Sequence, residues 1–165
     1  TEAPLPAALH RVTWRGYGPD ECYCDSREAQ SDGVWRQEAE QMGFDYSCPQ
    51  ENANRTGVRW AVMAGDEGQG LAVAASRPID LAVRPYSDEQ LRAAKHSCEL
   101  QPDPERLYVQ LDYRNSGLGS GSCGPSALAQ YKAYPIHYQW ELAFVPLCRG
   151  EDPTHAGRRA LGRLG

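Results

Sequence analysis

The stretch from Tyr46 to Trp60 concentrates hydrogen-bonding side chains in a short span that ends where a strand pattern begins. Such groups are costly to bury unless each has a partner. A guanidinium fork matches a carboxylate, so Arg55 or Arg59 is suited to pair with Glu21 or Glu51. The pattern therefore favours an internal polar network, with ligand contacts or a plain polar loop as alternatives. The predicted network contains Glu21, Glu51, Asn52, Arg55 and Arg59.

Six cysteines are the other reactive side chains, at Cys22, Cys24, Cys48, Cys98, Cys123 and Cys148. The pair Cys22-x-Cys24 is a poor internal disulfide, because strand geometry separates such side chains too widely. Zinc sites usually show Cys-x-x-Cys pairs, which are absent, so no metal site is predicted. We expect free thiols in a reducing compartment, and hence a cytoplasmic location, with a secreted and partly bridged form as the alternative.

The elements that must position these residues are mainly strands. Apolar and alternating runs predict strands at His10–Trp14, Val58–Met63, Leu71–Ala75, Ile79–Val83, Leu107–Leu111 and His137–Val145. A hairpin turn is predicted at Gly65–Gly68. Ser87 and Gln90 form a capping box that predicts a helix over Asp88–His96, and a weaker helix signal covers Val34–Met42. The pattern indicates an all-β fold, mainly an antiparallel β-sandwich, with one short helix of clear signal.

The chain is long enough for one domain. We divide it into an N-terminal extension over 1–9, a β-domain over 10–148 and a tail over 149–165. The pattern of strands dissolves after Cys148, so the tail is predicted to be disordered. A net charge of −5 gives no reason to expect nucleic acid. No run is long and apolar enough to predict a membrane span.

Five segments, in order, resemble one known family. The first is Trp14-x-Gly16-x-Gly18-Pro19-x-Glu21-x-Tyr23-x-Asp25, and the second is Pro49-Gln50-Glu51-Asn52-x-Asn54-Arg55-x-x-Val58-Arg59-Trp60. The third is Lys95-His96 with Glu99-Leu100. The fourth is Leu111-Asp112-Tyr113, which leads to Gly117-Leu118-Gly119 and Ser122-Cys123-Gly124-Pro125, and the fifth is the strand from Ile136 to Pro146. They are similar to the C-terminal domain, or small chain, of the β-galactosidases of glycoside hydrolase family 2. The resemblance implies a β-sandwich of the galactose-mutarotase-like type, of which this chain is the second half. Missing strands would leave open edges and favour an oligomer.

The resemblance also implies that the catalytic residues lie in a different domain from this chain. Glycoside hydrolysis with retention needs two carboxylates about 5–5.5 Å apart, and no pair of acids here has a spacing that specifies this geometry. In the family the catalytic glutamates and the magnesium ligands belong to a separate (β/α)₈ barrel. We therefore expect no catalytic residue and no cofactor in this chain, and the catalytic barrel domain or large subunit as its partner. Galactoside substrate would then be bound jointly with that partner.

One substrate contact is implied by the same resemblance. Some family members carry a tryptophan that stacks on sugar at the aglycone side, and Cys123 stands at its position. Ser122 and Cys123 are therefore the predicted aglycone rim, although a thiol cannot replace the aromatic stacking. A plain turn, with backbone freedom supplied by Gly117, Gly119, Gly121 and Gly124, is the alternative.

The function expected from the sequence is the C-terminal part of a β-galactosidase that completes the site for terminal β-D-galactosides such as lactose. The alternatives are a free-standing carbohydrate-binding β-sandwich and a degenerate remnant with a structural role. Ala53, which stands where the family usually has glycine, favours the remnant.

Overall fold

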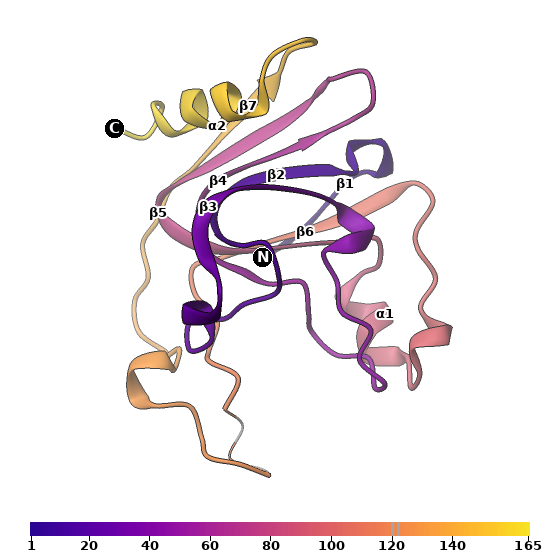
Figure 1. The fold of residues 1–165 in the computed structure, drawn as a ribbon, viewed down its shortest axis with the longest axis vertical. Helices are drawn as coiled ribbons and strands as arrows, with labels where there is room; N and C mark the ends of the chain where they lie inside the picture. The colour runs from indigo at the N-terminus through magenta and orange to yellow at the C-terminus, as the bar shows by residue number, and fades with distance from the viewer. Residues whose placement is uncertain (120, 122) are drawn as a thin grey trace.

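The computed structural model describes residues 1–119, 121 and 123–165. It contains β1 (Glu2–Pro6), β2 (Arg11–Gly18), β3 (Ser31–Glu38), β4 (Arg55–Ala64), β5 (Gly70–Arg84), β6 (Arg106–Asp112), β7 (Leu142–Leu147), α1 (Asp88–Ala93) and α2 (Pro153–Leu161). The strands form one sheet in the order β1-β6-β5-β4-β2-β3, and β7 pairs with β5 outside this path. Every pairing is antiparallel (Figure 1). The predicted antiparallel, mainly β fold is confirmed, while its place in a larger sandwich stays a prediction.

The central strands β4 and β5 are apolar on both faces because each face is covered. Along β4, Trp60, Val62 and Ala64 enter one core cluster, whereas Ala61 and Met63 enter another. The same alternation continues in β5. Side chains alternate between the two faces of a strand, so burial on both faces produces the continuous apolar runs seen in the sequence.

The strand β5 connects most of the sheet. Its first half pairs with β4 and β7, and its second half pairs with β6. The predicted strands at Leu71–Ala75 and Ile79–Val83 are thus two halves of one element, joined through exposed residues at 76–78.

The predicted turn at Gly65–Gly68 is confirmed, since the amide of Gly68 donates to the carbonyl of Gly65 at 3.0 Å. In Figure 1 β6 and β1 run below β2 and β4, and the larger core cluster draws residues from both levels.

Glycines at the β2–β3 end allow two tryptophans to pack closely. A Cβ atom on Gly16 would lie 2.9 Å from the Cα atom of Val58, and one on Gly18 would lie 2.8 Å from the Trp35 ring. Separations this short force neighbouring atoms to move. The indole of Trp35 also donates to the carbonyl of Gly16 at 3.2 Å. The weak helix prediction over Val34–Met42 is therefore wrong: β3 occupies 31–38, because its pairing with β2 overrides the local signal.

Other boundaries also shift. The capping box at Ser87 and Gln90 is confirmed by both of its hydrogen bonds, but α1 ends at Ala93 rather than His96. The closing strand begins at Leu142, so residues 137–141 are not part of it. At the N-terminus, Glu2–Pro6 lies within the predicted extension over 1–9 and pairs with β6 as an edge strand.

The prediction of a disordered tail over 149–165 is wrong for most of its length. The side chain of Asp152 caps the amides of Thr154 and His155, and Pro153 occupies the first turn of α2. Both features are typical helix starts. Ala156, Gly157 and Ala160 are buried against the cluster that contains Trp60, Val145 and Leu147. The sequence signal was weak because the buried residues are small and lie among arginines, which make the segment look polar in composition.

The contact between Gly157 and Trp60 yields a stability prediction. A Cβ atom at Gly157 would lie 2.3 Å from the indole ring, so Gly157→Ala forces α2 away from the sheet. Overpacking of this kind costs about 1–3 kcal/mol, which outweighs the roughly 1 kcal/mol that alanine adds to helix propensity. We expect a lower melting temperature in thermal unfolding. The control Gly162→Ala, whose added Cβ atom meets its nearest neighbour at 3.6 Å, should leave it unchanged.

Candidate functional site

Arg55 is the centre of the polar network. Its side chain is buried at 1% exposure at the start of β4, and its guanidinium lies 5.4 Å from the Trp14 ring. It donates to the carbonyls of Pro19 at 2.9 Å, Ala53 at 3.0 Å and Met42 at 3.2 Å, and to the side-chain oxygen of Gln37 at 2.9 Å. Burial lowers the pKa of Arg55. One cation thus joins four separate segments of the chain.

Glu21, Asn52 and Asn54 complete this region. The carboxylate of Glu21 accepts from the Ala53 amide at 2.6 Å and from the Tyr46 hydroxyl at 2.7 Å, and the latter bond raises the pKa of Tyr46 to about 12. Asn54 donates to the carbonyl of Cys22 at 2.8 Å. The side chain of Asn52 donates to the carbonyl of Gln50 at 3.0 Å. These bonds hold the 49–54 loop against the sheet.

The expected ion pairs do not form. Arg55 binds carbonyl and amide oxygens instead of the carboxylates of Glu21 or Glu51. Glu51 and Arg59 are exposed, and neither side chain makes a hydrogen bond or ion pair with another described residue. Residue type alone could not tell carbonyl binding from an ion pair, because the N–H groups of a guanidinium can donate to either kind of oxygen. The structure therefore joins Glu21 and Arg55 through the main chain of Ala53, buries Asn52 beside it, and leaves Glu51 and Arg59 outside.

The predicted aglycone rim lies in the segment between β6 and β7, which we call the rim segment (residues 113–141). Ser122 lies outside the described residues, and Cys123 is exposed. Among the four glycines, backbone freedom is required only at Gly121, whose φ is +73°. At Gly117 the reason is space, because a Cβ atom there would lie 2.3 Å from the Asp25 carboxylate. Gly124 has open space around it.

Asn115 anchors the rim segment to strand β5, and Gly117 connects two parts of the segment to each other. The amide of Asn115 donates to the carboxylate of Asp80 at 2.6 Å, and its side chain donates to that of Asn54 at 3.1 Å. The Cys24 thiol lies 3.5 Å from the carbonyl of Tyr131, which also accepts the Gly117 amide at 2.7 Å. Asn54 thus connects the 49–54 loop to the rim segment.

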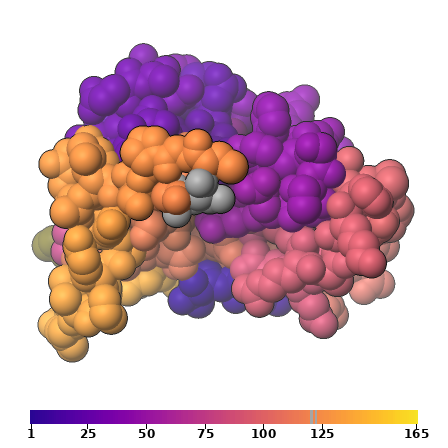
Figure 2. Space-filling model, turned by 90° about the horizontal axis from the view of Figure 1, so that it is seen from below, coloured from indigo at the N-terminus to yellow at the C-terminus, as the bar shows by residue number. Residues whose placement is uncertain are grey.

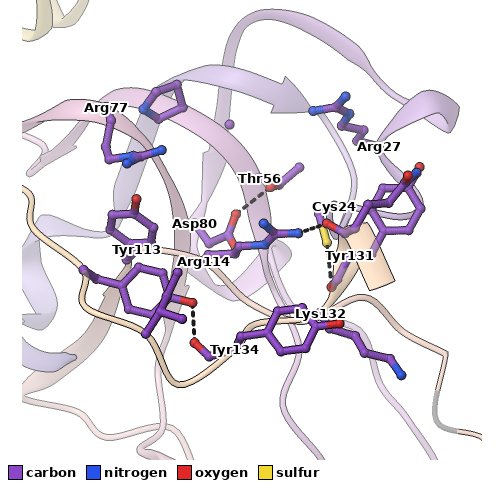
Figure 3. A pocket seen from close by; sticks show the side chains of 15 residues that line it. Cys24, Arg27, Thr56, Arg77, Asp80, Tyr113, Arg114, Tyr131, Lys132 and Tyr134 are labelled. Atoms are coloured by element: carbon purple, nitrogen blue, oxygen red, sulfur yellow. Dashed lines mark hydrogen bonds between the residues drawn. The ribbon is translucent and has the colours of Figure 1, made fainter. Parts of the chain in front are cut away.

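A pocket of about 640 Å³ lies between the rim segment and strands β4 and β5 (Figure 3). Asp80 is at its centre and accepts from the Thr56 hydroxyl at 2.5 Å. Burial raises the pKa of Asp80 to about 6, although the bonds from Thr56 and Asn115 oppose the shift. Tyrosines and cations line the rest of the pocket: Tyr113, Tyr131, Tyr134, Tyr138, Arg27, Arg77, Arg114 and Lys132.

Sequence reasoning missed this pocket. The available signal was Asp80, a single carboxylate inside the apolar run Ile79–Val83, where an unpartnered charge would be costly. The tyrosines come from parts of the rim segment that have no strand pattern. Their convergence depends on tertiary structure.

Two cysteines lie beside the polar network and the pocket, Cys22 and Cys24. Burial raises the pKa of Cys22 and of Cys24, which keeps both thiols protonated and weakly nucleophilic. Within the residues that the structure describes, no group of three or more His, Cys, Asp or Glu side chains is placed to hold a metal ion. None of the helices described is long and apolar enough to cross a membrane.

The antiparallel sheet and its irregular, tyrosine-rich segment define a mainly β domain, and comparison with known proteins identifies its family. Residues 1–144 match the family described as β-galactosidase small chain. A β-galactosidase of Actinobacillus pleuropneumoniae is 35% identical over 78% of this chain and 12% of its own length. The β-galactosidase BgaC of Bifidobacterium adolescentis is 33% identical over 86% of this chain and 13% of its own, and that of Kluyveromyces lactis is 33% identical over 79% and 13%.

The chain therefore belongs to the β-galactosidase small-chain family, as the resemblance predicted. It spans about an eighth of the length of these curated relatives. The helix α2 follows the matched residues, which end at 144.

The Arg55 contacts predict a large loss of stability on substitution. Arg55→Ala leaves buried carbonyl groups and the Gln37 amide without a partner, so we expect a loss of about 3 kcal/mol or more in the free energy of unfolding. Arg55→Lys keeps the charge without the fork and should recover only part of the loss. Denaturant unfolding measures both. Arg59→Ala should change stability by less than about 0.5 kcal/mol, and equal effects at 55 and 59 would contradict this account.

The pKa of Asp80 predicts a pH dependence of stability. The folded-state pKa is about 6, above the unfolded value of about 4, so the folded chain binds more protons between these values. Stability should therefore fall by roughly 2–3 kcal/mol as pH rises from about 4 to about 6. Asp80→Asn can accept from the Asn115 amide and donate to Thr56, and should remove most of this slope. Glu141→Gln, which alters an exposed acid, should retain the slope in unfolding measured across this range.

Proposed function

We propose that this chain packs against the catalytic barrel domain or large subunit of a β-galactosidase and completes its sugar-binding site. The joint site would hydrolyse terminal β-D-galactosides such as lactose. The chain would not be catalytic alone, and any magnesium would be held by the partner. Membership of the small-chain family and the names of the relatives support this proposal. A cytoplasmic location is proposed with it.

The observation that carries the proposal is an apolar surface on the rim segment. Of the eight large hydrophobic side chains exposed in the described part of the chain, four belong to this segment: Leu118, Leu128, Tyr134 and Ile136. This excess of exposed apolar side chains in one segment supports a surface that a partner covers. Figure 2 shows the face on which the rim segment, in orange, lies beside the purple 40–50 region.

The start of the rim segment is held in place although its backbone is irregular. The bonds of Asn115 to Asp80 and Asn54 tie its start to the sheet, and the amide of Ala127 returns to the carbonyl of Gly119 at 3.0 Å. A binding site works best when its residues are held by such supporting contacts. The exposed Cys123 lies in the loop between these anchors, which suits the proposed position at the aglycone rim.

Complementation tests the proposal directly. This chain would be mixed with the Actinobacillus pleuropneumoniae relative truncated to remove the region that the chain matches, and hydrolysis of a chromogenic β-galactoside would be measured. We expect activity in the mixture and none in either part alone, because the catalytic carboxylates are expected in the partner. Activity of this chain alone would overturn the proposal, as would a mixture that neither gains activity nor forms a complex in analytical ultracentrifugation.

A matched pair of glycine variants makes the test specific to the rim segment. Gly117→Ala pushes against Asp25 and displaces the loop, so the restored activity should fall about tenfold or more. Gly124→Ala meets open space and should retain it. Circular dichroism of both variants verifies that the sheet is unchanged.

A further inference from the structure

The pocket around Asp80 is lined by more cations than carboxylates. Arg77, Arg114 and Lys132 line it, and none of them has a carboxylate within 4.0 Å among the described residues. Asp80 is the one carboxylate among its lining residues, and both of its oxygens already accept hydrogen bonds, from Thr56 and from the Asn115 amide. This charge gathers in a chain whose net charge is −5. The imbalance indicates an anionic ligand.

The same pocket offers flat aromatic surfaces. Tyr113 packs against the tilted ring of Tyr138, with 4.4 Å between ring centroids, and meets Trp140 edge-on at 6.3 Å, which holds its ring in place. The guanidinium of Arg77 lies 4.3 Å from the centre of the Tyr113 ring (Figure 3). Stacking on a ring leaves the N–H edge of an arginine available to a bidentate acceptor. Tyr134 is exposed at the same opening, and its carbonyl accepts from the Tyr138 hydroxyl at 2.6 Å.

The pocket therefore combines cations, which can bind an anionic group, with aromatic rings, which can pack against a sugar. We propose that this pocket binds an anionic saccharide, a pyranose that carries a phosphate or sulfate ester. The arginines take the ester, since a guanidinium pairs with such oxyanions through two parallel hydrogen bonds. The exposed ring of Tyr134 takes the apolar face of the sugar ring. A volume of about 640 Å³ accommodates one or two sugar units.

Titration calorimetry of the whole chain tests the ligand class. The probes are galactose 6-phosphate, galactose 6-sulfate, galactose and inorganic phosphate, at low ionic strength and neutral pH. We expect at least one ester to bind about tenfold or more tightly than galactose and than inorganic phosphate, and to weaken as salt is added. If galactose binds as tightly as the esters, the requirement for an anionic group is wrong. If inorganic phosphate binds as tightly as the esters, the requirement for a sugar is wrong. If no probe binds, the whole proposal is wrong.

Three variants assign the binding to this pocket. Arg77→Gln removes an exposed cation and should weaken binding of the ester about tenfold. Arg149→Gln removes an exposed arginine that does not line the pocket, and should leave affinity unchanged. Tyr134→Ala retains the carbonyl that Tyr138 uses and should weaken the sugar ester while leaving any binding of inorganic phosphate unaltered. Equal effects of Arg77→Gln and Arg149→Gln would contradict the assignment.

This inference does not depend on complementation. Binding is measured on the chain alone, whereas the proposed function is measured with the truncated β-galactosidase, so the failure of either one is recognised separately.

Discussion

The buried guanidinium of Arg55 is the interaction on which most of this structure depends. This cation has no carboxylate within 4.0 Å among the described residues. It is tolerated because its N–H groups donate to main-chain carbonyls and to Gln37, and because one face of the guanidinium packs on Trp14. Removing such a group costs far more than its net contribution, since the buried oxygens would be left without partners. The arrangement brings the ends of β2, β3 and β4 together with the 49–54 loop. The rim segment is in turn tied to that loop through Asn54 and Asn115.

Close packing of the sheet then explains the two glycines of the Trp14–Asp25 segment. Gly16 and Gly18 leave room for Val58, Trp14 and Trp35, so they are required by neighbours rather than by backbone conformation. Ala53 is the opposite case, because its φ of +69° lies in the left-handed region. An alanine there costs on the order of 1–2 kcal/mol. The bonds from its amide to Glu21 and from Arg55 to its carbonyl hold it in place.

A firm sheet that carries an irregular, apolar and aromatic segment is a suitable design for a domain that acts through a partner. The described part of the rim segment contributes tyrosines and cations to the pocket, and burial keeps the thiols of Cys22 and Cys24 protonated. The exposed apolar residues and the cationic pocket occupy the same segment, so docking on a partner and recognition of a ligand would be coupled through the same anchors. Asp80 is central to both, because it holds Asn115 and forms the centre of the pocket.

The sequence by itself determined the family, the antiparallel β class, the β4–β5 hairpin and the capped start of α1. These features depend on local periodicity, turn residues and ordered motifs, which a linear pattern records. Only the tertiary structure decided that Arg55 binds carbonyls rather than Glu21 or Glu51, that residues 31–38 form β3, and that α2 covers the sheet. It also decided that tyrosines and arginines distant in sequence meet around Asp80. The reason is physical: partners of a buried polar or small side chain are chosen by distance in space, and composition does not encode that distance.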